Sequence, residues 1–289
     1  MLAQLLTSGI AQGALYALLA LSMTVVFRAT AVVNFGQGDF LMIGAFAVYV
    51  LVVLLGLPFL AAAAAAMVLL FLLGVLMERW LIRPIQAGPP LSIAMMALAA
   101  GYFLRGGATL VWGREVLPFP RVYPDHSFMV GTAIITSNDL VVTGGVLTLL
   151  GLLVLLFLLT PVGRTARAVF QSPKGAALVG IDVHGFQGLT WGLGAGMAAV
   201  GGILVAPITL LYPDMAAFSL IRGFAAMTLG GFGSFPGAVL GGFLLGVMEL
   251  LVGGYVGSDY VEITPYVAII VVLLIRPVGL LGRVSRVRV

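Results

Sequence analysis

Long apolar segments constrain this chain more than any other feature. Eight stretches approach the roughly 20 apolar residues that a helix needs to cross a bilayer. They lie at about 8–27, 39–56, 58–77, 91–111, 139–160, 187–211, 236–253 and 262–276. A ninth stretch, 217–230, contains Arg222 and is too short to cross unaided, so a broken or re-entrant helix is expected there. Because only 8% of the residues are charged, against about 25% in soluble domains, we predict an all-α polytopic membrane protein.

The connections between these segments are too short to fold as separate domains, so residues 1–289 are expected to form a single transmembrane domain. The two long connections are at about 112–138 and 160–186. Arg and Lys concentrate in cytoplasmic loops. If the 160–186 loop is cytoplasmic, ten basic residues share its side, namely Arg28, Arg79, Arg83, Arg164, Arg167, Lys174, Arg276, Arg283, Arg286 and Arg288, against Arg105, Arg114, Arg121 and Arg222. We therefore predict that the 160–186 loop is cytoplasmic and that the 112–138 loop lies on the outer side. The C-terminus is predicted to be cytoplasmic if the 217–230 stretch counts as a full crossing.

The 160–186 loop contains two signals for a helix start. Thr160 precedes Pro161 and Ser172 precedes Pro173, which places a capping hydroxyl before a proline suited to the first helical position. Gly180 is a natural stop. The loop also carries basic residues, and the small residues Ala168, Ser172, Ala176 and Gly180 recur every four positions, which on a helix would form one stripe that another surface can approach closely. The candidate contact residues of the loop are Arg164, Arg167, Ala168, Ser172, Pro173, Lys174, Ala176, Gly180 and Ile181. This pattern predicts a docking surface for another protein; the alternative is an ordinary connecting loop.

Glycine is about twice as frequent as the usual 7% or so, with 39 in 289 residues. Gly188, Gly192 and Gly196 repeat every four residues, which on a helix forms a small face that lets a neighbour approach closely. Most glycines are therefore expected to serve helix packing.

Two glycine-rich stretches interrupt apolar sequence with polar groups. The first is Asn34, Phe35, Gly36, Gln37, Gly38 and Asp39; the second contains Gly230, Gly231, Gly233, Ser234 and Gly237. Aligning 35–46 with 232–243 gives four identities in twelve positions. Irregular backbone at membrane depth is tolerated where it is buried in protein or lines a cavity, and paired interruptions in two halves often mark a transport pathway. We interpret both as pathway or gate segments, with purely structural turns as the alternative.

Glu249 is the acid placed inside an apolar span, where a charge costs roughly 2.5–3.5 kcal/mol on insertion scales. It is expected to face the interior with a partner, and Arg222 is the nearest cation in sequence. The sequence allows two roles for Glu249, as a member of a structural ion pair or as a residue of the transport pathway. Asp39 and Glu78 fall at predicted span ends, where solvated boundary charges are expected.

The sequence lacks the elements of several chemistries. A phosphate-binding G-x-x-x-x-G-K-[ST] loop needs a lysine, and the single lysine, Lys174, stands in SPKGAA. His126 and His184 fall in different predicted loops, so we expect no metal site, and we expect no cofactor, no enzymatic activity and no nucleic-acid partner. A membrane chain with a docking loop and no energy source of its own predicts that energy is supplied by another subunit.

The segments singled out above resemble those of the permease subunits of branched-chain amino-acid ABC importers, specifically the shorter, LivH-type member of the pair. Asn34–Asp39 with the following Gly44-Ala45 is similar to the family's N-F-A-H-G-[ED] run, and Arg167 to Ile181 is similar to its ATPase-contacting segment. Gly230–Ala238 with Gly241, Gly242 and Glu249 is similar to its G-G-x-G-S-x-x-G-A stretch and the acid after it. The chain departs from the family at Gln37, in place of a histidine, and at Ser172, in place of an acid or amide.

The resemblance implies a transport subunit in a bacterial inner membrane. It implies a second, longer permease, two cytoplasmic ATP-binding subunits and a periplasmic substrate-binding protein as partners, with branched-chain or related apolar amino acids as cargo. Because the family extends further, urea, short amides and aromatic acids are alternative cargoes. An ion-coupled carrier or a channel acting alone is an alternative of a different class.

Overall fold

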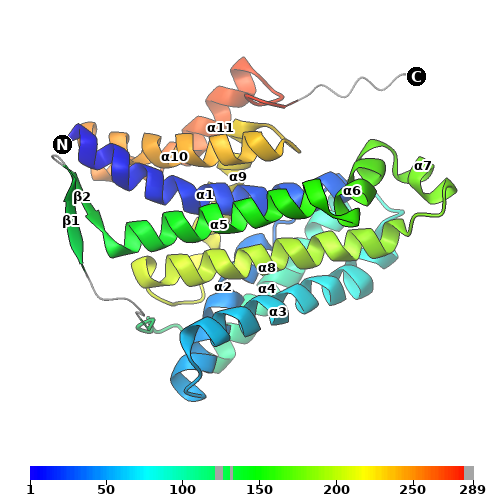
Figure 1. The fold of residues 1–289 in the computed structure, drawn as a ribbon, viewed down its shortest axis with the longest axis horizontal. Helices are drawn as coiled ribbons and strands as arrows, with labels where there is room; N and C mark the ends of the chain where they lie inside the picture. The colour runs from blue at the N-terminus through cyan, green and yellow to red at the C-terminus, as the bar shows by residue number, and fades with distance from the viewer. Residues whose placement is uncertain (121–125, 131–132, 283–289) are drawn as a thin grey trace. The chain divides into compact units, whose positions relative to one another are not determined.

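The computed structural model describes residues 1–120, 126–130 and 133–282 (Figure 1). Within them the chain is almost entirely helical. The helices and strands are α1 (Leu2–Thr30), α2 (Gln37–Tyr49), α3 (Phe59–Met77), α4 (Pro90–Trp112), β1 (Ser127–Val130), β2 (Ala133–Thr136), α5 (Ser137–Leu159), α6 (Pro161–Gln171), α7 (Pro173–Leu178), α8 (Val183–Thr209), α9 (Met215–Gly230), α10 (Phe235–Tyr255) and α11 (Thr264–Ile275). Val50–Leu54 and Glu78–Ile82 are π-helical continuations of α2 and α3.

Seven helices in the described residues are long and apolar enough to cross a membrane. They are Leu2–Thr30, Gln37–Leu54, Phe59–Ile85, Pro90–Trp112, Ser137–Leu159, Val183–Thr209 and Phe235–Tyr255. The prediction of a polytopic all-α membrane protein is therefore confirmed. The eighth expected span, 262–276, is shorter than predicted. Helix α11 has 12 residues, because it begins at Thr264 with Pro265 in its first turn, and the Arg276-Pro277 pair disfavours helix beyond Ile275. The short helix expected at 217–230 is present as α9, with 16 residues.

The loop at 112–138 contains the two strands of the described residues. Strands β1 and β2 pair antiparallel, with Ser127 opposite Thr136 and Met129 opposite Ile134. Four residues used in the orientation count, Arg121, Arg283, Arg286 and Arg288, lie outside the described residues.

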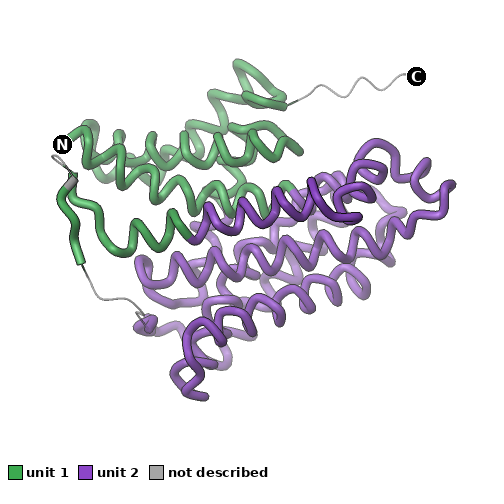
Figure 2. Tube along the Cα trace, in the orientation of Figure 1, with its two compact units in different colours: residues 1–24, 123–144, 221–289 green, residues 25–122, 145–220 purple. Residues whose placement is uncertain are grey.

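The chain forms two compact units, coloured separately in Figure 2. The unit of residues 25–122 and 145–220 is built around α8, whose small residues face α2 and α3. A Cβ placed on Gly74 of α3 would lie 2.6 Å from the carbonyl oxygen of Trp191, and one on Gly192 would lie 2.8 Å from the ring of Phe71. At such separations an added Cβ would force its neighbour to move. The predicted packing role of the Gly188–Gly196 stripe is confirmed, and its neighbour is α3.

In the unit of residues 1–24, 123–144 and 221–289, the first part of α1 packs on α10 through glycine. A Cβ on Gly13 would lie 2.8 Å from the Cα of Phe243, and one on Gly242 would overlap the backbone of Ala17. Backbone thus meets backbone, as in close helix pairs in lipid.

The α1–α10 contact predicts a strong effect of a single methyl group. Gly242→Ala is expected to lower the free energy of unfolding by about 1–3 kcal/mol or more, because the backbone of Ala17 cannot move aside as a side chain would. Gly106→Ala in α4 is the matched control, since a Cβ there meets nothing within 4 Å. It should be neutral or stabilising by up to about 1 kcal/mol. Thermal unfolding in mild detergent compares the two; equal stability would contradict the packing described.

Candidate functional site

The loop between α5 and α8 folds as a helical hairpin, residues 160–181, which we call the α6–α7 hairpin (Figure 1). Both predicted helix starts are present. Ser172 caps α7, its Oγ accepting a hydrogen bond of 3.0 Å from the Gly175 N–H. Thr160 holds the cap position of α6, but its hydroxyl donates to the Leu156 carbonyl at 2.6 Å instead of capping. The end of α5 and the start of α6 are thus tied together.

Gly180 ends α7, as predicted. Its φ is +83°, which a residue with a side chain rarely adopts. The Ile181 N–H donates to the Ala176 carbonyl at 3.0 Å and the Gly180 N–H donates to Ala177 at 3.1 Å, which is the Schellman arrangement. The hairpin therefore has a defined shape set by its own sequence.

The prediction that the small residues form one stripe along a single helix is wrong. The chain breaks at Ser172, so Ala168 and Ala176 belong to different helices. Ala176 is 4% exposed and points into a hydrophobic cluster that also contains Ala29, Ala166, Val169 and Phe186. Ala168 packs against the same cluster. These small residues hold the hairpin together and attach it to α8 and the end of α1, so they are not offered to another protein.

The outward face of the hairpin is basic and apolar. Arg164, Arg167 and Lys174 are exposed, as are Ser172, Pro173 and Gly180. Leu178 and Val179 are 89% and 75% exposed, and the sequence reading missed them. The signal that could have found them is two large apolar residues placed beside the helix-stopping glycine of a polar loop. Large apolar side chains exposed on a hairpin that also carries exposed basic residues are typical of a protein contact surface.

The Asn34–Asp39 segment forms a buried polar turn at the start of α2. Asn34, Gln37 and Asp39 are each 1% exposed. Asn34 accepts from the Gly36 N–H at 3.0 Å and donates to Gln37 Oε1 at 3.0 Å. Gln37 Nε2 donates to the Gly194 carbonyl of α8 at 2.7 Å. The turn is thereby fixed to the middle of α8 by a side chain at the position where the family pattern has histidine.

Asp39 and Glu78 are not the solvated boundary charges that were expected. Asp39 pairs with Arg105 of α4 at 2.9 Å. Glu78 is 0% exposed and pairs with Arg83 at 2.8 Å. Asp39 is brought to its partner by packing of α2 on α4: a Cβ on Gly36 would lie 2.7 Å from the Ala97 carbonyl oxygen. Burial of each carboxylate requires the arginine.

The second glycine-rich segment is the turn between α9 and α10. Gly231 and Gly233 have φ values of +108° and +75°, so glycine is needed at both. Ser234 caps α10 by accepting from the Gly237 N–H at 3.1 Å. The C-terminal segment crosses this turn, with the Leu281 N–H donating to the Gly230 carbonyl at 2.8 Å. The two glycine-rich segments belong to different compact units.

Glu249 sits in a closed hydrogen-bond network in α10. It is 0% exposed, and Arg222 of α9 donates to its Oε1 at 3.0 Å, as the partner predicted from sequence. Tyr16 and Gln12 of α1, which the sequence reading missed, both donate to its Oε2. The ring of Tyr16 also lies 5.9 Å from the Arg222 guanidinium carbon. The network fastens α1, α9 and α10 together within one unit.

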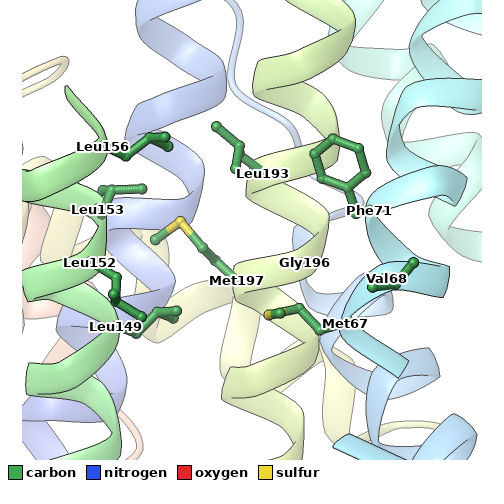
Figure 3. Close-up of a pocket in the computed structure, with 10 residues that line it drawn as sticks. All are labelled: Met67, Val68, Phe71, Leu149, Leu152, Leu153, Leu156, Leu193, Gly196 and Met197. Atoms are coloured by element: carbon green, nitrogen blue, oxygen red, sulfur yellow. The ribbon is translucent and has the colours of Figure 1, made fainter. Parts of the chain in front are cut away.

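An apolar groove of about 370 Å³ lies among α3, α5 and α8 (Figure 3). Every side chain that lines it is apolar: Met67, Val68, Phe71, Leu149, Leu152, Leu153, Leu156, Leu193 and Met197, with Gly196. The groove offers no side-chain partner for the charged groups of an amino acid, so it is not a substrate site for a zwitterion. In the described part of the chain, no three His, Asp or Glu side chains gather closely enough to hold a metal ion.

The seven apolar spans of the described residues define a multi-pass membrane protein. Residues 5–275 match the family model described as the permease component of the branched-chain amino acid transport system, and the chain belongs to that family.

Named relatives cover almost the whole chain. The high-affinity branched-chain amino acid transport system permease protein BraD of Pseudomonas aeruginosa is 32% identical, over 97% of this chain and 95% of the relative. The LivH protein of Escherichia coli is 30% identical over the same shares. A probable LivH protein of Methanocaldococcus jannaschii is also 30% identical, over 93% and 89%. The solved structure of PsaBC from Streptococcus pneumoniae in complex with Fab shares the fold, with a TM-score of 0.50 at 13% identity, covering 93% of this chain and 91% of that one.

Proposed function

We propose that this chain is the permease subunit of an ATP-driven importer, with residues 1–289 acting as one permease domain. The α6–α7 hairpin carries the proposal. It exposes Leu178 and Val179 and also three basic residues, while its other face is anchored on α8 and the end of α1. A hairpin that is exposed on one face and anchored on the other suits contact with a partner that moves it. The chain has no phosphate-binding loop of its own, so that partner would supply the ATP hydrolysis.

The assembly that we propose contains this chain, a second and longer permease, two ATP-binding subunits on the hairpin side and a periplasmic binding protein on the opposite side. The hairpin and the C-terminus would then be cytoplasmic, in a bacterial inner membrane. Family membership and the names of the relatives support branched-chain or related apolar amino acids as cargo. Urea, short amides and aromatic acids are alternatives within the same mechanism.

The stand-alone carrier is disfavoured by the buried acids. Ion-coupled carriers need membrane-embedded ionisable groups that can release and rebind an ion. The buried carboxylates of the described residues are Asp39, Glu78 and Glu249, and each is held by an arginine. A carboxylate in such a pair is poorly suited to binding and releasing an ion during transport.

Co-purification tests the assembly. The tagged chain, expressed with the genes for the partner subunits, is expected to retain two ATP-binding subunits and a longer permease in mild detergent. Thermal shift of the cognate binding protein with leucine, isoleucine, valine, urea, acetamide and an aromatic acid then identifies the cargo. A chain that purifies alone and stays monomeric under these conditions would contradict the proposal.

A further inference from the structure

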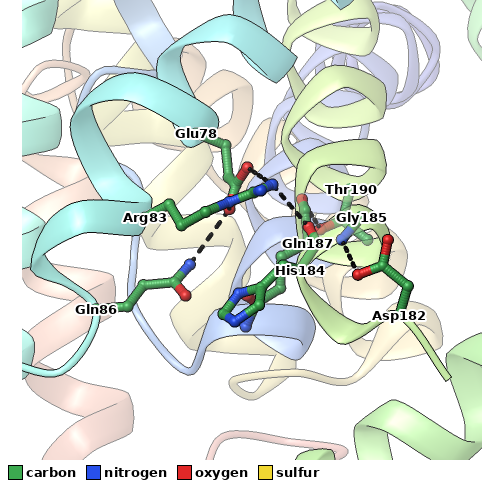
Figure 4. A network of polar contacts seen from close by, with 8 residues as sticks. All are labelled: Glu78, Arg83, Gln86, Asp182, His184, Gly185, Gln187 and Thr190. Atoms are coloured by element: carbon green, nitrogen blue, oxygen red, sulfur yellow. Dashed lines mark hydrogen bonds and ion pairs between the residues drawn. The ribbon is translucent and has the colours of Figure 1, made fainter. Parts of the chain in front are cut away.

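A polar network joins the end of α3 to the first turn of α8 (Figure 4). Arg83 contacts Glu78 through two bonds, Nη2 to Oε2 at 2.8 Å and Nε to Oε1 at 3.2 Å. The same Nη2 donates to the carbonyl oxygen of His184 at 3.2 Å. Gln86 adds a longer contact to Glu78 Oε1 at 3.4 Å. Arg83 is therefore shared between a buried carboxylate on one helix and a backbone carbonyl on another.

The π-helical turn explains why this pair can form. Glu78 and Arg83 are five residues apart, which on a regular α-helix would point them about 140° apart. The segment Glu78–Ile82 is π-helical, and the wider turn brings residues five apart onto the same side. Room for the carboxylate is left by Gly188 of α8, where a Cβ would lie 3.2 Å from Glu78 Oε2. The local irregularity of α3 and the glycine of α8 thus serve one contact.

His184 lies directly after the α6–α7 hairpin. Asp182 caps α8 by accepting from the Gly185 N–H at 2.8 Å. Phe186 belongs to the hydrophobic cluster of the hairpin, and Ile181 and Val183 pack against that cluster. A movement of the hairpin must therefore move the first turn of α8, which is the turn that Arg83 holds.

The same helix continues to the Asn34–Asp39 turn. Gln187 Nε2 donates to the carbonyl of Ala29, at the end of α1, at 3.3 Å. Ten residues beyond His184, about 15 Å along the helix, the Gly194 carbonyl accepts from Gln37. Helix α8 is thus linked to the hairpin, to α3 and to the buried turn before α2, all within one compact unit.

We propose that Arg83 is a positioning residue for coupled transport: with Glu78 it clamps the first turn of α8 to α3, so that hairpin movement shifts both helices together and reaches the Asn34–Asp39 turn. Without the clamp, the hairpin and the first turn of α8 would move while the adjacent end of α3 stays behind. The proposal rests on the proposed function, because that function supplies the movement.

Transport per ATP tests the clamp. Arg83→Gln is compared with Arg79→Gln, an exposed arginine of the same π turn that forms no ion pair with another described residue. The complete complex is reconstituted in liposomes, and leucine uptake and ATP hydrolysis are measured together. Arg83→Gln should lower the amount of leucine moved per ATP about two- to thirtyfold, with ATP hydrolysis retained. Arg83→Lys should recover part of the lost transport per ATP. Arg79→Gln should match the parent. An unchanged ratio in Arg83→Gln, or uptake and hydrolysis falling in equal proportion, would overturn the clamp.

A second measurement does not depend on transport. The chain has no cysteine, so spin labels can be placed by Leu76→Cys on α3 and Lys174→Cys on the hairpin. Arg83→Gln should broaden the distribution of the distance between the labels, whereas Arg79→Gln should leave it unchanged. Equal distance distributions in Arg83→Gln and the parent would overturn the clamp even if the parent complex transports nothing. Absence of ATP-dependent uptake by the parent complex would instead count against the proposed function.

Discussion

Arg222→Met is expected to lower the free energy of unfolding by about 3–5 kcal/mol, because it leaves the fully buried Glu249 carboxylate without its cation. Glu249→Leu should have a similar effect, since the side chain of Arg222 is only 18% exposed. The double substitution should recover most of the loss, because replacing both members of a buried pair by apolar groups is often close to neutral. Titration with SDS from mild detergent measures all three.

The control for these single and double substitutions is Glu262→Gln, which removes the charge of an exposed carboxylate in the same unit. It should change stability by no more than about 0.5 kcal/mol. Additive losses in the double variant would mean that Arg222 and Glu249 do not act as a pair. If the double variant folds but no longer transports, the pair also serves the pathway, which is the second role left open by the sequence.

Leu178→Asp combined with Val179→Asp is expected to abolish ATP-driven uptake while leaving the permease folded. Both side chains point away from the protein, at 89% and 75% exposure, so their replacement should alter stability by about 0.5 kcal/mol or less. At a partner interface, truncating a central apolar contact often costs about 2 kcal/mol or more, which is roughly thirtyfold in affinity. Binding of the purified ATP-binding subunits to permease in nanodiscs measures the loss.

Gln171→Asp separates charge from lost apolar contact in this test. Gln171 is exposed on the same hairpin, and the substitution adds a negative charge without removing apolar surface. It should weaken ATPase binding much less than the double substitution does. If the Leu178 and Val179 variant binds and hydrolyses ATP like the parent, these residues do not form the contact.

Features that depend on residues close in sequence could be predicted. The helix starts at Pro161 and Pro173 and the stop at Gly180 depend on residues a few positions apart, and all three occur as predicted. The Arg222 partner of Glu249 could also be predicted, because few cations are available inside apolar sequence. The apolar spans followed from length and composition, except α11, where prolines shorten the helix.

Contacts between residues far apart in sequence could not be predicted. Asp39 was expected in solvent because it stands at a span end, yet its partner Arg105 lies 66 residues away and is delivered by the α2–α4 contact. Glu78 was misjudged because the pairing with Arg83 needs a π turn, which residue spacing does not reveal. The stripe from Ala168 to Gly180 assumed one continuous helix, although Pro173 begins a second one. Exposure of Leu178 and Val179 depends on which face of the hairpin meets α8.

Uptake by reconstituted liposomes tests the central claim most directly. The complete assembly, with its binding protein outside and ATP inside, is predicted to accumulate radiolabelled leucine only when ATP is hydrolysed, and to lose this uptake with Leu178→Asp and Val179→Asp. Liposomes that contain this chain alone are predicted to show none. Leucine uptake by the chain alone, without ATP or partner subunits, would contradict the account and identify a stand-alone carrier or channel.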